Sequence, residues 1–376
     1  MKNFLFVCGG TAGHINPALA FAAEIKKNCK DAKFLFVGTP DGMEARLVPA
    51  AGFDFVGIPV MGFYRTLSVG SIKHNASAIR CLTTAGSKAK KIIKGFKPDL
   101  CFGTGGYVSG PVVKAAHSLK IKTAIHEQNA FPGVTNKLLS KYADIIFAAN
   151  DGAAKQLGGK TTPIVVGNPV RESIIFADKA AAIEKLDLDK SAPTILSFGG
   201  SLGADIINRA GADIIAHFVK TGENVNILHG YGRLGKEKFP RFLKENGVDI
   251  NALPKNIRVS EYINNMDDAL AAADVCISRA GALTLSELAV SETPAFLIPS
   301  PYVTANHQYH NAMEFKKAGA AEVMEEKDYN FESIQKFLQN VLFDSETAKN
   351  YRKGMAKMGI VNSAALVWEA LQALKS

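Results

Sequence analysis

The 376-residue sequence has few of the features that mark membrane-spanning, secreted or zinc-binding proteins. It has no run of about 18 apolar residues, and its first apolar run stops at Gly9, so we expect neither a membrane span nor a signal peptide. Its five cysteines are scattered and form no Cys-x-x-Cys pair, which argues against a disulfide framework or a zinc site. We expect a cytoplasmic protein with reduced, mostly buried thiols.

Acidic side chains are missing from residues 55–98, which contain eight lysines and arginines. These charges supply almost all of the formal net charge of +9. A local excess of this kind indicates a docking face for an anionic surface, although a solvated basic helix would have the same composition.

Hydrophobic residues make up 47% of the chain, enough for packed cores, so disorder is excluded and the length favours two domains. Short β-rich runs alternate with helical patterns, and several are apolar throughout, as is typical of parallel strands buried on both faces. This alternation predicts an α/β fold with right-handed βαβ units. We expect strands at Asn3–Cys8, Lys33–Val37, Asp99–Phe102, Thr123–His126, Ile145–Ala148, Thr194–Phe198, Val225–His229, Val275–Ser278 and Ala295–Ile298.

The chain has the pattern of a doubled architecture. A strand, a glycine turn and a helix start at Phe4–Gly13 and recur at Ile195–Ala204. The repetition predicts two facing Rossmann-like domains, residues 1–168 and 169–357, with a final helix at about 358–376 packing back on the first domain. Ligands of open α/β sheets bind at the carboxyl ends of the strands, so we expect an interdomain cleft.

Four glycine-bearing turns follow expected strands. Glycines let backbone amides approach a ligand, and helix N-termini attract anions, so together the turns favour a phosphate-bearing ligand. The alternative is that these glycines only end strands tightly. The turns are at residues 9–14, 103–111, 199–203 and 278–284, and the helix after the first is expected from about Pro17.

Two common nucleotide motifs are absent. Cys8 occupies the first glycine position of a G-x-G-x-x-G pattern, no acidic residue ends the second strand, and there is no P-loop. A sugar nucleotide fits better, because its diphosphate needs amides and a cation and its ribose needs a carboxylate. Arg171 and Glu287, the latter placed at the start of the helix after Gly281, are candidates for these roles. A surface ion pair and a helix-dipole glutamate are the alternatives.

His14 lies at the start of the first helix, after a glycine turn. A histidine facing a cleft there can act as a general base at neutral pH. The alternative is a histidine that is bonded only to the backbone.

Six ordered motifs between Lys2 and about Ala320 resemble the signature series of the MurG family of peptidoglycan glycosyltransferases. They are Gly9-Gly10-Thr11-Ala12-Gly13-His14-Ile15-Asn16-Pro17, Gly105-Gly106-Tyr107-Val108-Ser109-Gly110-Pro111, His126-Glu127-Gln128-Asn129, Gly167-Asn168-Pro169-Val170-Arg171, Gly199-Gly200-Ser201-Leu202-Gly203-Ala204 and Gly281-Ala282-Leu283-Thr284-Leu285-Ser286-Glu287.

The resemblance implies the GT-B fold and an inverting transfer. N-acetylglucosamine would move from UDP-N-acetylglucosamine to the 4-hydroxyl of lipid I, undecaprenyl-diphospho-N-acetylmuramoyl-pentapeptide, giving lipid II for peptidoglycan synthesis. His14 would be the base, with Glu127 in support. We expect no cofactor and no metal, since amides, helix dipoles and Arg171 can stabilise the departing diphosphate.

The resemblance also implies the binding residues. Ile263 would lie beside the uracil and Glu287 on the ribose hydroxyls. Ala12 and Leu202 depart from the glycine and glutamine common in the family, which puts any polar contact at Leu202 in doubt. The donor residues would be Thr11, Ala12, Gly13, Asn129, Arg171, Ser201, Ile263, Ala282, Leu283, Thr284, Leu285, Ser286, Glu287 and Gln308, and the acceptor's diphosphate would face Gly105, Gly106, Tyr107 and Ser109.

The basic segment 55–98 would then contact anionic lipid of the inner leaflet, placing the protein peripherally on the cytoplasmic face of the cell membrane. Trp368, the only tryptophan, cannot form an indole belt. Some apolar side chains of the segment would insert shallowly and others would belong to the core. These are Val60, Met61, Phe63, Tyr64, Leu67, Ile72, Ile79, Leu82, Ile92 and Ile93.

Two other functions fit parts of the sequence. One is another GT-B enzyme that uses a UDP-sugar, such as a diacylglycerol glycosyltransferase or a non-hydrolysing UDP-N-acetylglucosamine 2-epimerase. The other is a nucleic-acid-binding protein that uses the basic segment, but the interleaved aromatic residues and known binding motifs are missing. We therefore expect no nucleic-acid partner.

Overall fold

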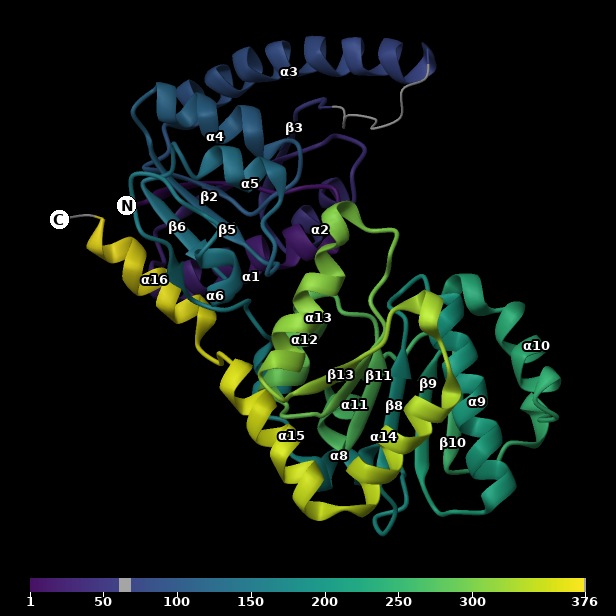
Figure 1. Ribbon diagram of the computed structural model, residues 1–376. Coiled ribbons are helices and arrows are strands. Elements are labelled where there is room, and N and C mark those ends of the chain that lie inside the picture. The colour runs from purple at the N-terminus through teal and green to yellow at the C-terminus, as the bar shows by residue number, and fades with distance from the viewer. Residues whose placement is uncertain (61–68, 375–376) are drawn as a thin grey trace. The chain divides into compact units, whose positions relative to one another are not determined.

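The computed structural model describes residues 1–60 and 69–374, with the backbone alone for residues 69–80, 82 and 83. It divides into two compact units, each built around one parallel sheet (Figure 1). The N-terminal unit comprises Met1–Pro169 and Asn362–Ser376, and the C-terminal unit comprises Val170–Val361. None of the helices in the described ranges has the length and apolar character needed to cross a bilayer.

The N-terminal sheet has the strand order β3-β2-β1-β4-β5-β6-β7, with every described pairing parallel. The direction of winding changes between β1 and β4, which opens a crevice outside the carboxyl ends of these two strands. The strands are β1 (Asn3–Val7), β2 (Lys33–Gly38), β3 (Asp54–Gly57), β4 (Leu100–Gly103), β5 (Lys122–Glu127), β6 (Ile145–Ala148) and β7 (Ile164–Val165).

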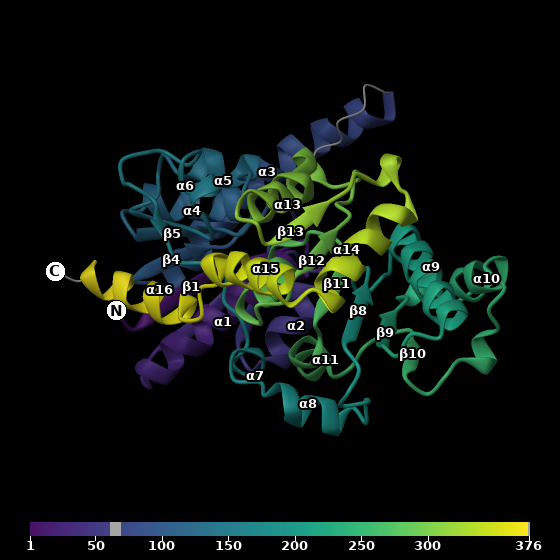
Figure 2. The same cartoon turned by 60° about the horizontal axis from the view of Figure 1, so that its bottom comes forward.

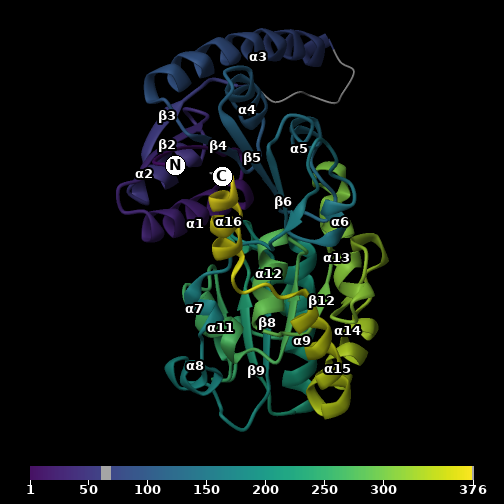
Figure 3. The same cartoon turned by 90° about the vertical axis from the view of Figure 1, so that its left-hand side faces the viewer.

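Helices cover both faces of this sheet. One face packs a stack of phenylalanines, including Phe6, Phe21 and Phe102, under α1 (Ala12–Asn28), α2 (Glu44–Ala50) and α16 (Ser363–Ala373). The helix α16 packs against α1 (Figure 3). The other face packs aliphatic residues under α3 (Val69–Phe96), α4 (Ser109–Ser118) and α5 (Val134–Leu139), and α6 (Asp151–Ala154) follows β6.

The C-terminal sheet has the order β10-β9-β8-β11-β12-β13, again with parallel pairings, and its winding changes between β8 and β11 (Figure 2). Its strands are β8 (Thr194–Phe198), β9 (Asn226–Gly230), β10 (Ile257–Ser260), β11 (Val275–Ser278), β12 (Ala295–Leu297) and β13 (Ala321–Val323).

Two apolar clusters fill the space between this sheet and its helices. One cluster draws on α9 (Asp205–Thr221), α10 (Lys238–Glu245) and α14 (Phe331–Phe343). The other draws on residues of α7 (Glu172–Ile175), α8 (Lys179–Lys185), α11 (Met266–Ala272), α12 (Ala282–Val290), α13 (His307–Lys317) and α15 (Ser345–Met358).

All nine expected strands are present; three have the expected bounds, and the ends of the other six differ by at most one residue. The four strands that were not predicted, β3, β7, β10 and β13, are the outer strands of the two sheets. They are short and largely half-exposed, so they lack the continuous apolar run that identifies a central strand.

The prediction that the first helix begins near Pro17 is wrong, because α1 begins at Ala12. Thr11 has extended backbone angles and is the N-cap, so the helix starts directly after the glycine turn. Pro17 is the sixth helical residue and removes only the backbone bond that its own N–H would have made to Gly13.

The cysteines are free, as predicted, and Cys8, Cys101 and Cys276 are buried whereas Cys29 and Cys81 are partly exposed. Burial raises the pKa of the Cys276 thiol to about 12. The buried thiols therefore stay protonated at neutral pH.

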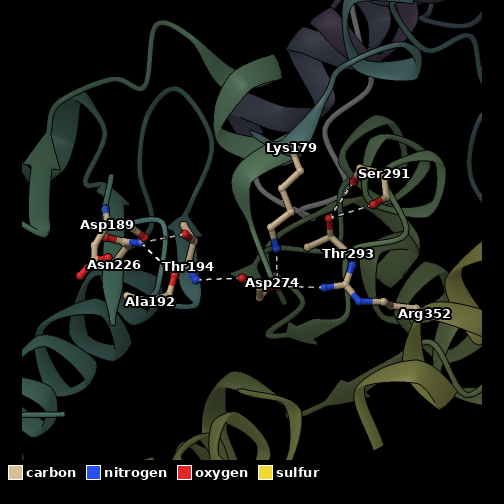
Figure 4. Close-up of polar contacts among 9 residues, drawn as sticks. All are labelled: Lys179, Asp189, Ala192, Thr194, Asn226, Asp274, Ser291, Thr293 and Arg352. Atoms are coloured by element: carbon tan, nitrogen blue, oxygen red, sulfur yellow. Dashed lines mark hydrogen bonds and ion pairs between the residues drawn. The ribbon is translucent and has the colours of Figure 1, made fainter. Parts of the chain in front are cut away.

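A polar cluster joins elements at the amino end of the C-terminal sheet (Figure 4). Asp274, just before β11, accepts hydrogen bonds from Lys179 Nζ at 2.5 Å, from Arg352 Nη2 at 3.1 Å and from the Thr194 backbone N–H at 3.0 Å. One carboxylate thus connects α8, α15 and the start of β8. It lies at the sheet edge opposite to the glycine turns, so we assign it a structural role.

Candidate active site

The four glycine turns follow the two central strands of each sheet. In the N-terminal unit they follow β1 and β4, and in the C-terminal unit they follow β8 and β11. These are the strands on either side of each change of winding, where open α/β sheets bind ligands. Each unit therefore presents a pair of glycine turns at its expected ligand crevice.

In the N-terminal unit the second turn packs directly on the first. Gly105 and Gly106 have φ of +125° and +85°, a region that favours glycine. A Cβ atom on Gly106 would lie 2.5 Å from the Gly9 carbonyl oxygen, and one on Gly105 would lie 2.5 Å from His14 Cδ2. The close contact of the two turns therefore depends on both glycines, and it places His14 against the second turn.

The orientation of His14 leaves one ring nitrogen available. Nδ1 lies 3.0 Å from the carbonyl oxygen of Gly9, and a carbonyl only accepts, so Nδ1 carries the proton. Thr104 Oγ1 donates to the His14 carbonyl at 2.7 Å and holds the start of the helix. No hydrogen bond reaches Nε2 from residues that the structure describes. A neutral imidazole in this tautomer can accept a proton at Nε2.

Glu127, expected to support His14, is engaged elsewhere. Glu127 is 2% exposed, and its carboxylate accepts four hydrogen bonds at 2.9–3.1 Å from the loop that follows β5 and from the adjoining helix α5. The donors are the backbone N–H and the side-chain amide of Asn129, the backbone N–H of Gly133 and the side-chain amide of Asn136. Within the described ranges no hydrogen bond joins Glu127 to His14, so the contacts of Glu127 are those of a residue that shapes its own loop.

His126 and Gln128 connect three segments of the N-terminal unit. Gln128 Nε2 donates to His126 Nδ1 at 2.9 Å and to the Thr104 carbonyl at 2.8 Å. His126 Nε2 donates to the Gly167 carbonyl at 2.9 Å, and Ser363 Oγ donates to the same oxygen at 3.1 Å. Burial lowers the pKa of His126 to about 4, so the ring is neutral. The motif resemblance included these residues but did not reveal their structural role.

Of the residues expected at the acceptor's diphosphate, Tyr107 is 53% exposed. Ser109 is buried, and its hydroxyl donates to the Gly105 carbonyl at 2.7 Å. Ser109 therefore stabilises the turn from inside, whereas the Tyr107 side chain is accessible.

In the C-terminal unit the third turn passes beside the end of β9. Ser201 is exposed and Leu202 is 50% exposed. Ile263, on the loop after β10, lies against Gly230, where a Cβ atom would be 3.2 Å from Ile263 Cγ1. The expected uracil neighbour is thus at the carboxyl edge of the sheet.

The fourth turn leads into α12, and Gly281 is its N-cap. Glu287 is the sixth residue of this helix, not part of its first turn as expected, because the helix begins immediately at Ala282. Its Oε1 lies 3.6 Å from Arg171 Nη2. Burial raises the pKa of Glu287, and the Arg171 guanidinium partly offsets this rise. The structure therefore brings together the expected ribose carboxylate and the expected phosphate-binding arginine.

Gln308, near the start of α13, accepts a hydrogen bond from the Ser300 N–H at 2.9 Å. Ala305 and Asn306 immediately before this helix have φ of +53° and +51°. Two consecutive non-glycine residues in the left-handed region are strained, and such strain is common at functional sites.

Arg279 was not predicted as a site residue, yet it connects three loops of the C-terminal unit. Its Nη1 donates to the carbonyls of Ile298 and Pro299 at 3.0 and 3.1 Å, and its Nη2 lies 2.7 Å from Glu326 Oε2. The Arg279 side chain is 13% exposed. An arginine directly after a fully buried strand was the available signal, because such a charge needs partners.

The described part of the basic segment 55–98 is divided between core and surface. Ile93 is buried, and Val60 and Ile92 pack against the same core. Lys88, Lys90, Lys91, Lys94 and Lys97 are exposed. Met61, Phe63, Tyr64, Arg65 and Leu67, and the side chains of Ile72, Lys73, Ile79, Arg80 and Leu82, lie outside the described residues.

A groove of about 750 Å³ lies between α3, α4 and α5. Its lining is mainly apolar and includes the exposed side chains of Tyr107, Val134 and Leu138. Lys90, Lys114 and Lys141 also line it. The groove therefore combines apolar surface with positive charge.

Among the described residues, no group of three or more histidine, cysteine, aspartate or glutamate side chains is arranged to hold a metal ion.

Comparisons with known proteins agree with this architecture. The glycosyltransferase family 28 N-terminal domain matches residues 4–148, and the family's C-terminal domain matches residues 194–367. A UDP-N-acetylglucosamine--N-acetylmuramyl-(pentapeptide) pyrophosphoryl-undecaprenol N-acetylglucosamine transferase of Acetivibrio thermocellus is 40% identical over 97% of this chain and 96% of its own length. A protein of the same name from Desulforamulus reducens is 42% identical over 93% of both chains.

Among solved structures, the MurG of Acinetobacter baumannii matches with a TM-score of 0.79 and 26% identity, covering 99% of this chain and 100% of the other. The fold is therefore that of the GT-B glycosyltransferases, with two Rossmann-like domains. The predicted resemblance is confirmed, and the chain belongs to glycosyltransferase family 28.

Proposed function

We propose that this chain transfers N-acetylglucosamine from UDP-N-acetylglucosamine to the 4-hydroxyl of lipid I, giving lipid II. Relatives of about the same length and 40–42% identity bear the name of this activity. The observation that carries the proposal at the level of the site is the pairing of Arg171 with Glu287 of α12, 3.6 Å apart. This combination of cation, carboxylate and helix amides matches the needs of a nucleotide diphosphate.

In the C-terminal unit, we assign the uridine to Ile263 and Glu287 and the diphosphate to Arg171 and the amides of the α12 N-terminus. A mostly buried carboxylate can accept two hydrogen bonds from the ribose diol, and a guanidinium can contact phosphate oxygens in bidentate fashion. The remaining assigned contacts are Ser201, Ala282, Leu283, Thr284, Leu285, Ser286 and Gln308.

In the N-terminal unit, we assign His14 as the base. Its Nε2 would take the proton from the acceptor hydroxyl as the hydroxyl oxygen bonds to the anomeric carbon. The bond from that carbon to the diphosphate breaks, and its electron pair leaves with UDP. Glu127 is assigned a supporting role through its loop. The donor contacts assigned here are Thr11, Ala12, Gly13 and Asn129, and the contacts of the acceptor's diphosphate are Gly105, Gly106, Tyr107 and Ser109.

We assign the membrane contact to the basic segment 55–98 and the adjoining groove between α3, α4 and α5. Five exposed lysines on or just after α3, together with Lys114 and Lys141, suit an anionic inner leaflet. The exposed Leu138 and Val134 suit shallow contact with lipid. The protein would act as a peripheral enzyme on the cytoplasmic face, where its lipid-linked acceptor is presented.

The direct test is transfer of labelled N-acetylglucosamine from the UDP-sugar to a lipid I analogue. We expect a labelled disaccharide lipid and stoichiometric UDP. Conversion of UDP-N-acetylglucosamine to an epimeric UDP-sugar without acceptor would instead support an epimerase, and no product together with no calorimetric signal for UDP would overturn the proposal.

The donor site has a sharper test in Glu287→Gln. This change removes the charge of the carboxylate that is proposed to accept hydrogen bonds from the ribose. The KM for UDP-N-acetylglucosamine should rise by about tenfold to a hundredfold, since a charge-assisted hydrogen bond contributes about 1.5–3 kcal/mol. Glu184→Gln is the matched control, because Glu184 is an exposed glutamate of the same unit paired only at 3.5 Å with Lys190. An unchanged KM in Glu287→Gln would refute this assignment.

A further inference from the structure

The peptide group between Gly9 and Gly10 connects His14 to a buried carboxylate. Its carbonyl oxygen lies 3.0 Å from His14 Nδ1. Its N–H donates to Glu44 Oε2 at 3.3 Å. Both contacts involve the same planar amide, so His14 and Glu44 lie at its two ends.

Glu44, the first residue of α2, is fully buried and held in one position. Its Oε1 accepts from the Thr39 N–H at 2.8 Å and from Thr39 Oγ1 at 2.6 Å. A Cβ atom on Gly9 would lie 2.6 Å from Oε1, so the absence of a side chain there makes room for the carboxylate.

Glu44 is ionised at neutral pH. Burial raises its pKa, but the hydrogen bonds from Thr39 and Gly10 outweigh burial and bring the pKa below its ordinary value. A fixed negative charge is therefore present behind the first glycine turn, one peptide group away from the imidazole.

We infer that Glu44 is a positioning residue that acts on His14 through the Gly9–Gly10 peptide group. The inference rests on the proposed function, in which His14 is the base. A carboxylate that accepts from an amide N–H polarises the amide, and the carbonyl at its other end becomes a stronger acceptor. That carbonyl then holds Nδ1–H more firmly and stabilises the imidazolium that forms when Nε2 takes the acceptor's proton. An aspartate bonded directly to a catalytic histidine has the same two effects in serine proteases.

The same arrangement limits what the first turn can bind. The Gly10 N–H already donates a hydrogen bond to Glu44, and the negative charge of Glu44 lies beneath the turn. Only the later amides at the start of α1 are then suited to an anionic ligand.

Other titratable groups near this turn do not supply the same charge. The first turn of α1 has no acidic residue. Burial and the charge of Glu44 both raise the pKa of Cys8, which is therefore neutral. The carboxylate of Glu127 is bonded within its own loop. Among the described residues of adjoining segments, Asp41 and Arg46 are exposed, and Tyr107 is 53% exposed.

The test is the pH dependence of kcat in Glu44→Gln, which keeps the side-chain volume but removes the charge. Because an anion raises the pKa of a nearby histidine, its loss should move the rising limb of the profile to lower pH by about half a unit to one unit, with kcat on the plateau lowered about tenfold. The KM for UDP-N-acetylglucosamine should stay within about twofold of the original value, because no donor contact is lost.

Thr39→Val is the control for local packing. It removes one hydrogen bond from the carboxylate but leaves the charge, so the protein should lose stability while the limb stays within about 0.3 pH units of wild type. The inference would be overturned if the rising limb of the pH profile of kcat stayed unchanged in Glu44→Gln. It would also be overturned if Thr39→Val shifted this limb by the same amount.

A second measurement covers the case in which Glu44→Gln does not fold. Nitrogen-15 NMR of the wild-type His14 ring should show the neutral tautomer with the proton on Nδ1, and a proton on Nε2 would overturn the inference. Absence of transferase activity in the wild type would refute the proposed function instead, and the tautomer would still be measurable.

Discussion

At the scale of single residues, the N-terminal unit depends on contacts that only glycine allows. The His14 ring lies against Gly105, and the Gly9 carbonyl lies against Gly106. The position and tautomer of the imidazole are therefore set by backbone groups of two turns that are about 90 residues apart in sequence. A side chain at either position would displace the ring or the turn.

Gly105→Ala tests this dependence. The new Cβ would lie 2.8 Å from Nε2 in a left-handed backbone region, so the ring must move. We expect kcat to fall by up to about a hundredfold, the cost of misplacing a catalytic group by about 1 Å, with little change in donor KM, if His14 is the base as proposed. Gly95→Ala is the control, because Gly95 is helical and has open space around it. Equal kcat values for both variants would contradict the arrangement described here.

At the scale of elements, the chain's local pattern predicts the central strands and fails at the edges. The runs at 145–148, 194–198 and 275–278 match β6, β8 and β11, because strands buried on both faces are apolar throughout. The four edge strands lack this apolar pattern and are identified only by their pairing with neighbouring strands in the structure. The elements are also joined by charged side chains, such as Arg279 and Asp274, whose partners no local pattern predicts.

Asp274→Asn tests the fastening of α8 and α15 to the C-terminal sheet (Figure 4). The amide cannot satisfy both cations, so we expect the unit to lose about 1–3 kcal/mol of its free energy of unfolding. Urea unfolding measures this loss, while turnover per folded molecule should stay the same. Asp187→Asn is the control, since Asp187 is a fully exposed partner of Arg258. A loss no larger than that of the control would show that the cluster adds little.

At the scale of the whole molecule, each unit has one fully buried neutral histidine among its described side chains. His126 in the N-terminal unit and His229 in the C-terminal unit have pKa values lowered, mainly by burial, to about 4 and about 3. Between these pKa values and about pH 6.5, the unfolded chain therefore binds protons at the two histidines that the folded units do not bind.

The free energy of unfolding should fall as the pH decreases through this window. The expected fall is about 1.4 kcal/mol per pH unit in the N-terminal unit and the same in the C-terminal unit. Denaturant unfolding from pH 7 to pH 4.5 measures the slope. In His229→Gln the slope of the C-terminal unit should flatten, and the N-terminal unit, with His126 intact, serves as the internal control. A slope that persists unchanged in this variant would assign the acid sensitivity to other groups.

The proposed membrane association is also a property of the whole molecule. Replacement of Lys90, Lys91 and Lys94 on α3 by alanine should weaken binding to anionic vesicles by roughly a hundredfold at low salt, at about 1 kcal/mol per lysine. Lys349, Lys353 and Lys357 are the matched control, an equally exposed triple on α15. Flotation with vesicles of anionic and neutral lipid measures the effect. The same loss from both triples would point to net charge and not to this face.

The sequence by itself determined the doubled α/β architecture, the places of the four glycine turns and the family, because buried parallel strands and glycine turns leave local patterns. It also identified Arg171, Glu287 and His14 as candidate chemical groups. Only the tertiary structure decided that Glu44 lies behind the first turn, that Glu127 is committed to its own loop and that Arg279 joins three loops. These facts depend on contacts between segments distant in the chain, and no local pattern encodes the partner of a buried charge.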